Sequence, residues 1–105
     1  MKNFKVQFVN EKIKEYYNKI TDLTLKNNLN KAFEKIIQNP FCCIQIPKKL
    51  IPKVYIKKYK IKNLWKYNLP NSWRLIYSIQ SNQITILSII LEWFNHKNYE
   101  RTFKY

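Results

Sequence analysis

Residues 63–91 read "NLWKYNLPNSWRLIYSIQSNQITILSIIL" and contain three apolar segments separated by turn signals. The first two segments, 63–69 and 72–79, flank Pro70-Asn71, a pair that suits a tight turn with proline at its second position. The third segment, 83–91, follows the polar triplet "QSN". Their length and their richness in β-branched and aromatic residues predict three consecutive strands of an antiparallel sheet.

The residues before this region predict one more strand and two helices. "FKVQFV" (4–9) alternates apolar and polar side chains with period two, which is typical of a strand, and Asn10 can cap the helix that follows. Two apolar stripes with helical spacing come next: Ile13, Tyr16, Tyr17 and Ile20, then Leu25, Leu29, Phe33, Ile36 and Ile37. The second stripe stops before Asn39-Pro40, because proline disfavours helix in the residue before it. The stripes predict a helical hairpin.

The middle and the end of the chain are less regular. Pro40 precedes residues 41–62 and Pro47 and Pro52 interrupt them, and a short helix at about 52–59 fits there with proline in its first turn. Residues 93–105, "WFNHKNYERTFKY", predict a short C-terminal segment of one or two helical turns. The whole chain, 1–105, is expected to be a single domain, because a second core would not fit. The order β-α-α-β-β-β predicts an α+β fold with an N-terminal strand, a helical hairpin and an antiparallel sheet of about four strands.

The charge of the chain points to a polyanionic partner. The net charge is +14, from 20 basic and six acidic residues, and no acidic residue occurs between Lys35 and Leu91. Coding from an AT-rich genome would explain the excess of lysine over arginine, but it explains the missing acids poorly. Nucleic acid is favoured over a membrane, because the basic segment 48–66 lacks the continuous amphipathic helix of a surface anchor.

Several other classes of protein do not fit the sequence. The N-terminus becomes charged before any apolar core develops, so no signal peptide is expected, and the apolar run 84–94 is too short to span a bilayer. Cys42 and Cys43 are adjacent and His96 is the single histidine. This pattern argues against a zinc site and a disulfide framework and predicts two reduced, partly buried thiols in the cytoplasm. Without glycine there is no phosphate-binding or dinucleotide loop, and no cofactor is expected.

Strand alternation predicts where catalytic side chains lie. Aromatic and aliphatic residues of 63–69 and 72–79 share one face, which leaves Lys66 and Arg74 together on the opposite face. If the apolar face covers the helical hairpin, these two cations emerge on an open side of the sheet. Arg74 is then either an edge-strand arginine that solvates the sheet or a guanidinium that grips a phosphate.

A second group of candidate residues follows the last strand. His96, Lys97 and Tyr99 could serve, with Arg74, as acid, base and phosphate stabiliser, although a histidine there could also be a solvated turn residue. The middle of the chain has no carboxylate cluster, so a two-metal nuclease is excluded and no metal is expected. Metal-free phosphodiester chemistry suits RNA, whose 2′-hydroxyl can attack the neighbouring phosphate.

The strand "WRLIYSI", the closing "HKNYERTF" and the order β-α-α-β-β-β resemble the RelE/ParE superfamily of toxins from type II toxin–antitoxin systems. The resemblance implies a cytoplasmic, ribosome-dependent endoribonuclease that cleaves mRNA, inhibits translation and pairs with an acidic antitoxin. It further implies that Arg74 stabilises phosphate, that His96, Lys97 and Tyr99 form the C-terminal catalytic group, and that Lys66 contacts RNA. ParE-like relatives instead poison DNA gyrase without cutting RNA, so a non-catalytic binder of gyrase, nucleic acid or antitoxin is the alternative.

The remaining predicted RNA contacts come from the lysine segment, which we define as residues 48–66, and from the C-terminal segment. Segment 41–62 is longer than in compact members of the superfamily. The lysine segment is interpreted as the rim of a surface that lies against ribosomal RNA, or under an acidic antitoxin when no ribosome is bound. The predicted contacts are Lys49, Lys53, Lys57, Lys58, Lys60, Lys62, Lys66 and Arg101.

Overall fold

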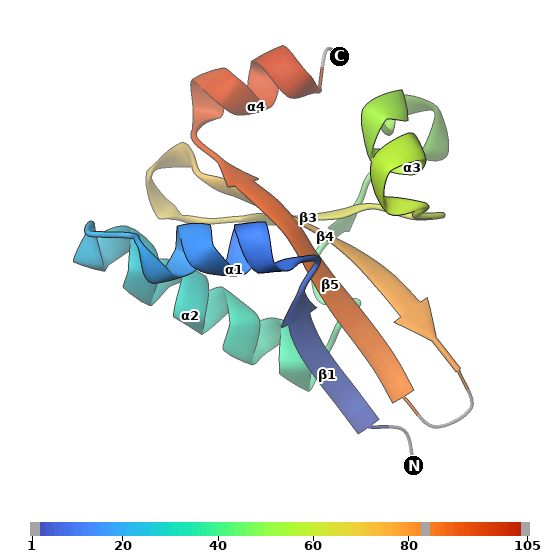
Figure 1. Cartoon of the computed structure of the whole chain (residues 1–105), viewed down its shortest axis with the longest axis horizontal. Coiled ribbons are helices and arrows are strands. Elements are labelled where there is room, and N and C mark those ends of the chain that lie inside the picture. Colours follow the sequence, from blue (N-terminus) through green and yellow to red (C-terminus); the bar gives the residue numbers. More distant parts are fainter. Residues whose placement is uncertain (1–2, 83–84, 104–105) are drawn as a thin grey trace.

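Five strands form one sheet in the order β1-β5-β4-β3-β2 (Figure 1). The computed structural model describes residues 3–82 and 85–103. Strand β1 pairs in parallel with β5, and every other neighbouring pair is antiparallel. The strands are β1 (Asn3–Phe8), β2 (Ile44–Gln45), β3 (Trp65–Asn68), β4 (Arg74–Ser81) and β5 (Thr85–Phe94).

The predicted α+β fold is confirmed, but the sheet differs from the prediction in three ways, the first being that β1 is parallel to β5 in a sheet expected to be antiparallel. Strand β2 was not predicted, because two residues cannot show a periodic pattern. Strand β3 is shorter than the predicted 63–69, since the Asn63 side chain takes over the pairing to β4. Its amide donates to the carbonyl of Ile79 and accepts from the Ile79 N–H, both at 2.8 Å. The first two residues of the predicted strand 83–91 lie outside the described residues.

In the described part of the chain, four α-helices accompany the sheet, and polar side chains cap three of them. Asn10 Oδ1 accepts from the Ile13 N–H at 2.9 Å, as predicted, while Asp22 caps α2 and Asn95 caps α4 in the same way. Such side chains satisfy backbone donors that the first helical turn leaves unpaired. The helical hairpin and the short helix at 52–59 are thus confirmed. The helices are α1 (Glu11–Asn18), α2 (Leu23–Gln38), α3 (Lys53–Tyr59) and α4 (His96–Thr102).

One face of the sheet packs against α2. The predicted apolar residues of β3 and β4 lie on this face, and Tyr77 at its centre is fully buried. Helix α1 adds Tyr17, which packs with Phe8 and Phe33 at centroid distances of 5.3 and 5.9 Å. This α2-side core is formed by Leu25, Leu29, Ala32, Ile36, Leu69, Leu75, Tyr77, Ile79, Ile86 and Ile90.

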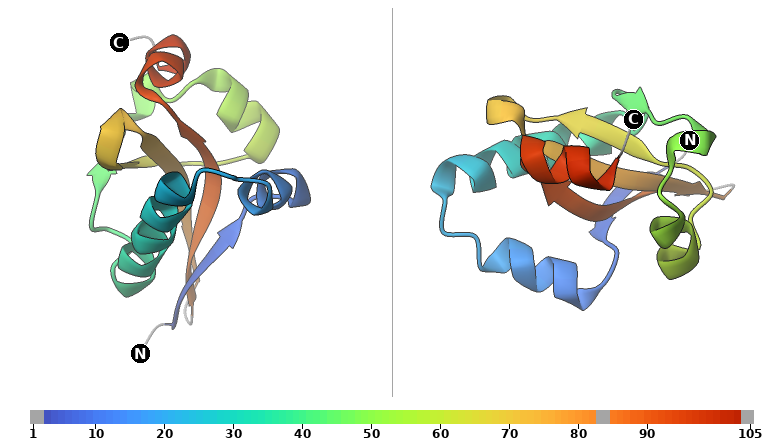
Figure 2. Two further views of the ribbon diagram at one scale, coloured as in Figure 1. Left: turned by 90° about the vertical axis from the view of Figure 1, so that its left-hand side faces the viewer. Right: turned by 90° about the horizontal axis from the view of Figure 1, so that it is seen from above.

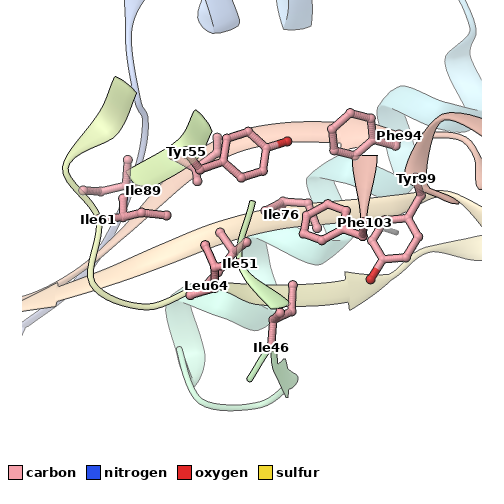
Figure 3. Close-up of a cluster of buried hydrophobic side chains, with 11 residues drawn as sticks. Ile46, Ile51, Tyr55, Ile61, Leu64, Ile76, Ile89, Phe94, Tyr99 and Phe103 are labelled. Atoms are coloured by element: carbon pink, nitrogen blue, oxygen red, sulfur yellow. The ribbon is translucent and has the colours of Figure 1, made fainter. Parts of the chain in front are cut away.

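The opposite face of the sheet is not open, and the prediction of an open side is wrong. Helix α3 covers this face, so that α2 and α3 lie on opposite sides of the sheet (Figure 2). Helix α4 adds Tyr99 and Phe103 to the same cover (Figure 3). The physical reason is the aliphatic content of segment 46–64, which buries apolar area between its lysines. This α3-side core is formed by Ile46, Ile51, Tyr55, Ile61, Leu64, Ile76, Ile89, Leu91, Phe94, Tyr99 and Phe103.

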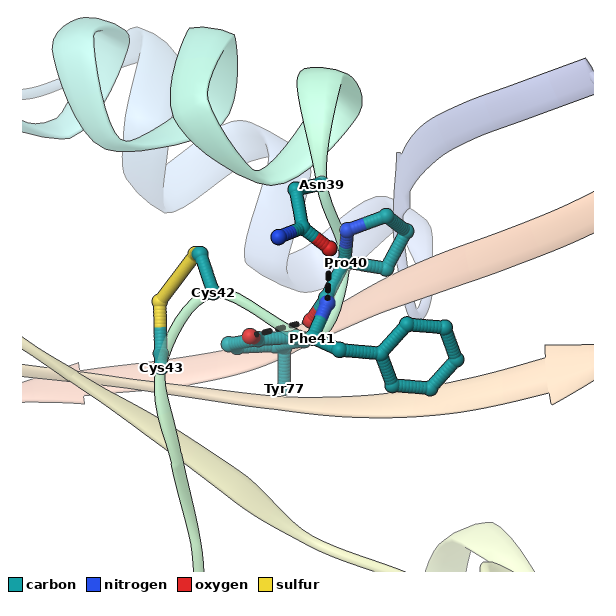
Figure 4. The surroundings of a disulfide bond; sticks show 6 residues. All are labelled: Asn39, Pro40, Phe41, Cys42, Cys43 and Tyr77. Atoms are coloured by element: carbon teal, nitrogen blue, oxygen red, sulfur yellow. Dashed lines mark hydrogen bonds between the residues drawn. A yellow bond between two sulfur atoms is a disulfide. The ribbon is translucent and has the colours of Figure 1, made fainter.

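The two cysteines are joined, which corrects the prediction of reduced thiols. A disulfide links Cys42 to Cys43 in the turn that leads from α2 to β2 (Figure 4). The same turn is fixed by the buried hydroxyl of Tyr77, which donates to the carbonyl of Pro40 at 2.7 Å. Two cysteines are too few for a framework of several bridges, but they allow this single bond. Neighbouring residues close only a small ring, so this bond holds no separate parts of the fold together.

Candidate nucleic-acid interface

Lys66 and Arg74 meet on the same face of the sheet, as strand alternation predicted. Lys66 Nζ lies 5.4 Å and Arg74 Cζ 5.8 Å from the centroid of the Tyr99 ring. Both distances are within the range in which a cation is attracted to an aromatic face. We call Lys66 and Arg74 the cationic pair. Strands β3 and β4 and helix α4 each contribute one residue to this group of three.

Tyr99 is held in place by packing at the end of the sheet. Its side chain is 5% exposed and stacks on Phe103 with ring centroids 4.6 Å apart. Figure 3 shows its hydroxyl pointing away from Phe94. The cap formed by Asn95 starts α4 directly after β5 and so fixes where the Tyr99 ring lies. The ring is therefore a rigid support for the two cations.

Arg74 does not belong to an edge strand. Strand β4 lies between β3 and β5, and Arg74 pairs with Asn68 on one side and Phe94 on the other. Its Nη1 donates to the carbonyl of Trp73 at 3.1 Å, and the residue is partly buried. The interpretation as a solvating edge arginine is wrong. A guanidinium fixed by a backbone carbonyl and an aromatic ring is oriented before any ligand arrives.

The structure does not bring His96 and Lys97 to the cationic pair. Both residues are exposed in the first turn of α4, whereas Tyr99 is buried. His96 Nε2 lies 2.8 Å from Glu100 Oε1, with the two side chains 57% and 66% exposed. Exposed ion pairs of this kind add little stability, so they hold the imidazole only weakly.

The predicted RNA contacts of the lysine segment lie on the surface, except for Lys66. Lys66 is partly buried, and Lys60 ends α3 in the left-handed conformation, with φ of 56°. Arg101 is exposed on α4. Ile51, Tyr55, Ile61 and Leu64 of the segment turn inward to the α3-side core. Val54 and Ile56 are exposed like most of its lysines, so one segment serves both as a cover and as a basic surface. The exposed lysines among the predicted contacts are Lys49, Lys53, Lys57, Lys58, Lys60 and Lys62.

Sequence reasoning missed one polar pair beneath α3. The Tyr55 hydroxyl donates to Glu92 Oε2 at 2.9 Å. Burial, followed by the charge of Glu92 and the hydrogen bond to it, raises the pKa of Tyr55 well above its ordinary value. Glu92 could have been noticed, since it is the first acidic residue after Glu34 and stands inside an apolar strand. The sequence did not show that its partner Tyr55 is buried, because a tyrosine in a basic helix can equally well be exposed or buried.

In the described part of the chain, no helix is long and apolar enough to cross a membrane. The same residues contain no group of three or more histidine, cysteine or carboxylate side chains that could hold a metal ion.

Comparison with protein-family models, with curated proteins and with solved structures finds no match to this chain. The resemblance to RelE/ParE toxins therefore stays a prediction that depends on short motifs, and the function is argued from the chain's own residues.

Proposed function

We propose that this chain is a RelE-like toxin, a metal-independent endoribonuclease that cleaves mRNA on the ribosome and inhibits translation in the cytoplasm. The observation that carries the proposal is the cationic pair, held on the ring of Tyr99 at the end of a central strand. The chain has a net charge of +14, which favours contact with ribosomal RNA. An acidic antitoxin would cover the same surface when the toxin is inactive.

The proposed chemistry uses the RNA's own 2′-hydroxyl as the nucleophile. A base takes the proton of this hydroxyl, its oxygen bonds to phosphorus, and the bond to the 5′-oxygen breaks as that oxygen gains a proton. Arg74 grips the phosphate oxygens bidentately as their charge grows, and Lys66 is the second cation. His96 is the candidate base and Lys97 the candidate acid; both are exposed on α4, away from the cationic pair, and would meet the phosphate only once RNA is bound. Tyr99 acts as a positioning residue for the cationic pair.

The second candidate is a non-catalytic binder, either a ParE-like gyrase inhibitor or a protein that only holds RNA or antitoxin. One observation favours it: His96 pairs with Glu100 on the surface of α4, and among the described residues no contact joins His96 to the cationic pair. Growth arrest on expression is expected for either toxin. Cleaved mRNA in a translating extract selects the first candidate, and gyrase-linked DNA damage selects the gyrase inhibitor.

Substitution of Arg74 tests the proposed active site. Arg74→Ala is expected to lower the rate of ribosome-dependent mRNA cleavage roughly 100- to 1,000-fold, the usual effect of removing a charge-stabilising group. Arg74→Lys should recover only part of the rate, because an ammonium cannot reproduce the bidentate grip. Arg74→Ala should lower the free energy of unfolding only by the value of one cation–π contact, about 0.5–1 kcal/mol.

The matched control for Arg74 is Lys31→Ala, which removes one exposed positive charge from α2. It should cleave mRNA like the parent. Each variant is melted thermally beside the cleavage assay, so that loss of fold is separated from loss of chemistry. If Arg74→Ala stays folded and cleaves mRNA at the parental rate, the proposed site is wrong. If the parent binds ribosomes and cleaves nothing, the binder replaces the enzyme.

A further inference from the structure

A cavity of about 310 Å³ lies between α1, α3 and the end of β5, and neither member of the cationic pair lines it. A second hollow of about 190 Å³ adjoins it and shares Ile13, Tyr16 and Glu92 with the first. The volume of the larger cavity is at the low end of the range for small-molecule sites, a size for a nucleobase more than for a large ligand. Glu92 stands where the two hollows meet.

Glu92 is the unusual residue of this cavity. All six acidic residues of the chain are described, and five are exposed while Glu92 alone is partly buried. Despite 20 basic residues in the sequence, no lysine or arginine of the described residues forms an ion pair with it. Among the described residues, the one hydrogen bond to its carboxylate comes from Tyr55, which leaves most of the acceptor sites of the carboxylate unused.

A β-bulge directs Glu92 into the cavity. Ile76 pairs with Glu92 and Tyr77 with Ile90, so Leu91 is an extra residue in β5. Bulges bend a strand locally and re-aim a side chain, and they recur beside functional sites. Here the bulge allows Leu91 to enter the α3-side core while Glu92, the next residue, lines the cavity.

The walls of the cavity are aromatic and its rim is basic. Tyr55 and Tyr59 of α3 stack with centroids 6.1 Å apart, and Tyr16 of α1 lines the opposite wall at 52% exposure. The rim carries two exposed lysines, Lys12 on α1 and Lys58 on α3. Tyrosine rings offer a base a stacking surface, and lysines at the rim offer a phosphate two cations.

We propose that this cavity binds the guanine base of a nucleotide, with Glu92 accepting its N1–H and 2-amino protons. Tyr16 and Tyr59, the wall tyrosines that are not buried, stack on the base. Lys12 and Lys58, which lie 5.8 and 5.3 Å from the centroids of these two rings, hold the attached phosphate. Guanine is the base whose Watson–Crick edge presents two adjacent donors, which match the two oxygens of a carboxylate. Adenine, cytosine and uracil present one donor beside an acceptor, and that acceptor would face a carboxylate oxygen without a proton between them.

The charge of the protein decides between a nucleotide and an organic cation. A carboxylate among tyrosines could also receive an ammonium group, as aromatic cages do. Two rim lysines and a net charge of +14 repel such a ligand. They attract an anion, and a nucleotide combines a neutral donor edge with a negatively charged phosphate.

A free guanine nucleotide and an unpaired guanosine within RNA share this chemistry. The inference does not rest on RNA cleavage: the site would select guanine whether the chain cuts RNA or only binds it. If the cleavage assay fails while guanine preference holds, the enzyme proposal falls and the site stands. If mRNA cleavage is observed without any preference for guanine, the guanine site is wrong and the enzyme proposal stands.

The first experiment uses the purified full chain and isothermal titration with four ribonucleoside 5′-monophosphates. GMP is expected to bind roughly 10- to 100-fold more tightly than AMP, CMP or UMP, the discrimination typical of one bidentate contact to a base. IMP keeps N1–H but lacks the 2-amino group and should bind roughly tenfold more weakly than GMP. Short RNA oligomers with one central G, compared with A at the same place, show whether the source is RNA.

Two variants test the roles of the named residues. Glu92→Gln should reduce the preference for GMP over AMP roughly tenfold, and Glu34→Gln, which removes an exposed acid from α2, should leave it unchanged. Lys58→Gln should weaken GMP several-fold while hardly affecting guanosine, which has no phosphate. Because the nucleotide series is measured on the parent, the proposal is testable even if a variant does not fold. Equal binding of all four nucleotides, no binding of GMP at millimolar concentration, or parental preference in a folded Glu92→Gln would each overturn it.

Discussion

At the scale of single residues, Tyr55 makes stability depend on alkaline pH. Its pKa lies above the ordinary tyrosine value of about 10 because burial and the adjacent Glu92 disfavour its ionised form. The folded state therefore keeps the proton that the unfolded chain loses. The stability contributed by Tyr55 is complete below pH 10 and is lost as pH rises above it, at up to about 1.4 kcal/mol per pH unit.

Tyr55→Phe tests this pH dependence. The free energy of unfolding of the variant should fall less steeply than that of the parent between about pH 10 and 11. Tyr16→Phe, which removes the hydroxyl of a tyrosine that is 52% exposed, should follow the parent. Urea unfolding at a series of pH values gives all three curves, and comparison with the parent cancels the titration of the lysines. Parallel curves for Tyr55→Phe and the parent would contradict the burial argument.

Side-chain direction in the strands could be predicted from the sequence, but the surroundings could not. Period-two alternation sufficed to place Lys66 and Arg74 on one face, and their shared contact with Tyr99 agrees with it. That contact itself depends on how α4 docks, and α4 docks through Phe103, which packs against Tyr55 of α3, a residue far earlier in the chain. No local pattern carries such information. For the same reason Glu92 and Tyr55 could not be paired in advance.

At the scale of elements, the start of α2 depends on one carboxylate. Asp22 Oδ1 accepts from the N–H groups of Thr24 and Leu25 at 3.0 and 3.2 Å. Asp22→Ala should lower the free energy of unfolding by about 1 kcal/mol, since two donors lose their acceptor and the helix dipole loses a favourable charge. Asp22→Asn changes the charge equally and keeps the cap, so it should retain most of the stability. Equal losses for the two variants in urea unfolding would show that charge, not capping, is responsible.

The elements themselves followed from sequence wherever the pattern was long enough. The two helical stripes and the three strands are long enough to show both a repeat of apolar residues and residues that mark their ends. Asn10 marks the start of α1 and Pro40 follows the end of α2, as predicted. The sequence did not show that β1 runs parallel to β5. Apolar and polar side chains alternate along β1 in the same way whichever direction its neighbour runs. The cover formed by α3 was missed because its lysines dominate the pattern. Its buried members, such as Ile51 and Tyr55, are spaced too irregularly to reveal a face.

At the scale of the whole molecule, the positive charge is unevenly distributed along the chain as well as large. The helices α1 and α2 carry lysines together with Glu11, Glu15 and Glu34, whereas the lysine segment contains no acidic residue. An AT-rich genome explains many lysines, but it does not explain this separation. Adsorption driven by total charge would be sensitive to any lysine of the chain. Binding through a defined surface is sensitive to the lysines of that surface.

A salt titration with two matched triple variants shows whether total charge or the lysine segment governs the binding of RNA. The logarithm of the affinity for a uridine oligomer should fall linearly with the logarithm of salt concentration, with a slope that implies on the order of 4–8 phosphate contacts. Lys57, Lys58 and Lys60 are exposed in the lysine segment, and changing them together to glutamine should flatten the slope by about two to three units. The control changes Lys14, Lys19 and Lys31, exposed on the helical hairpin, and lowers the net charge equally. If both triples flatten the slope to the same extent, total charge governs the binding and the lysine segment is an ordinary solvated surface.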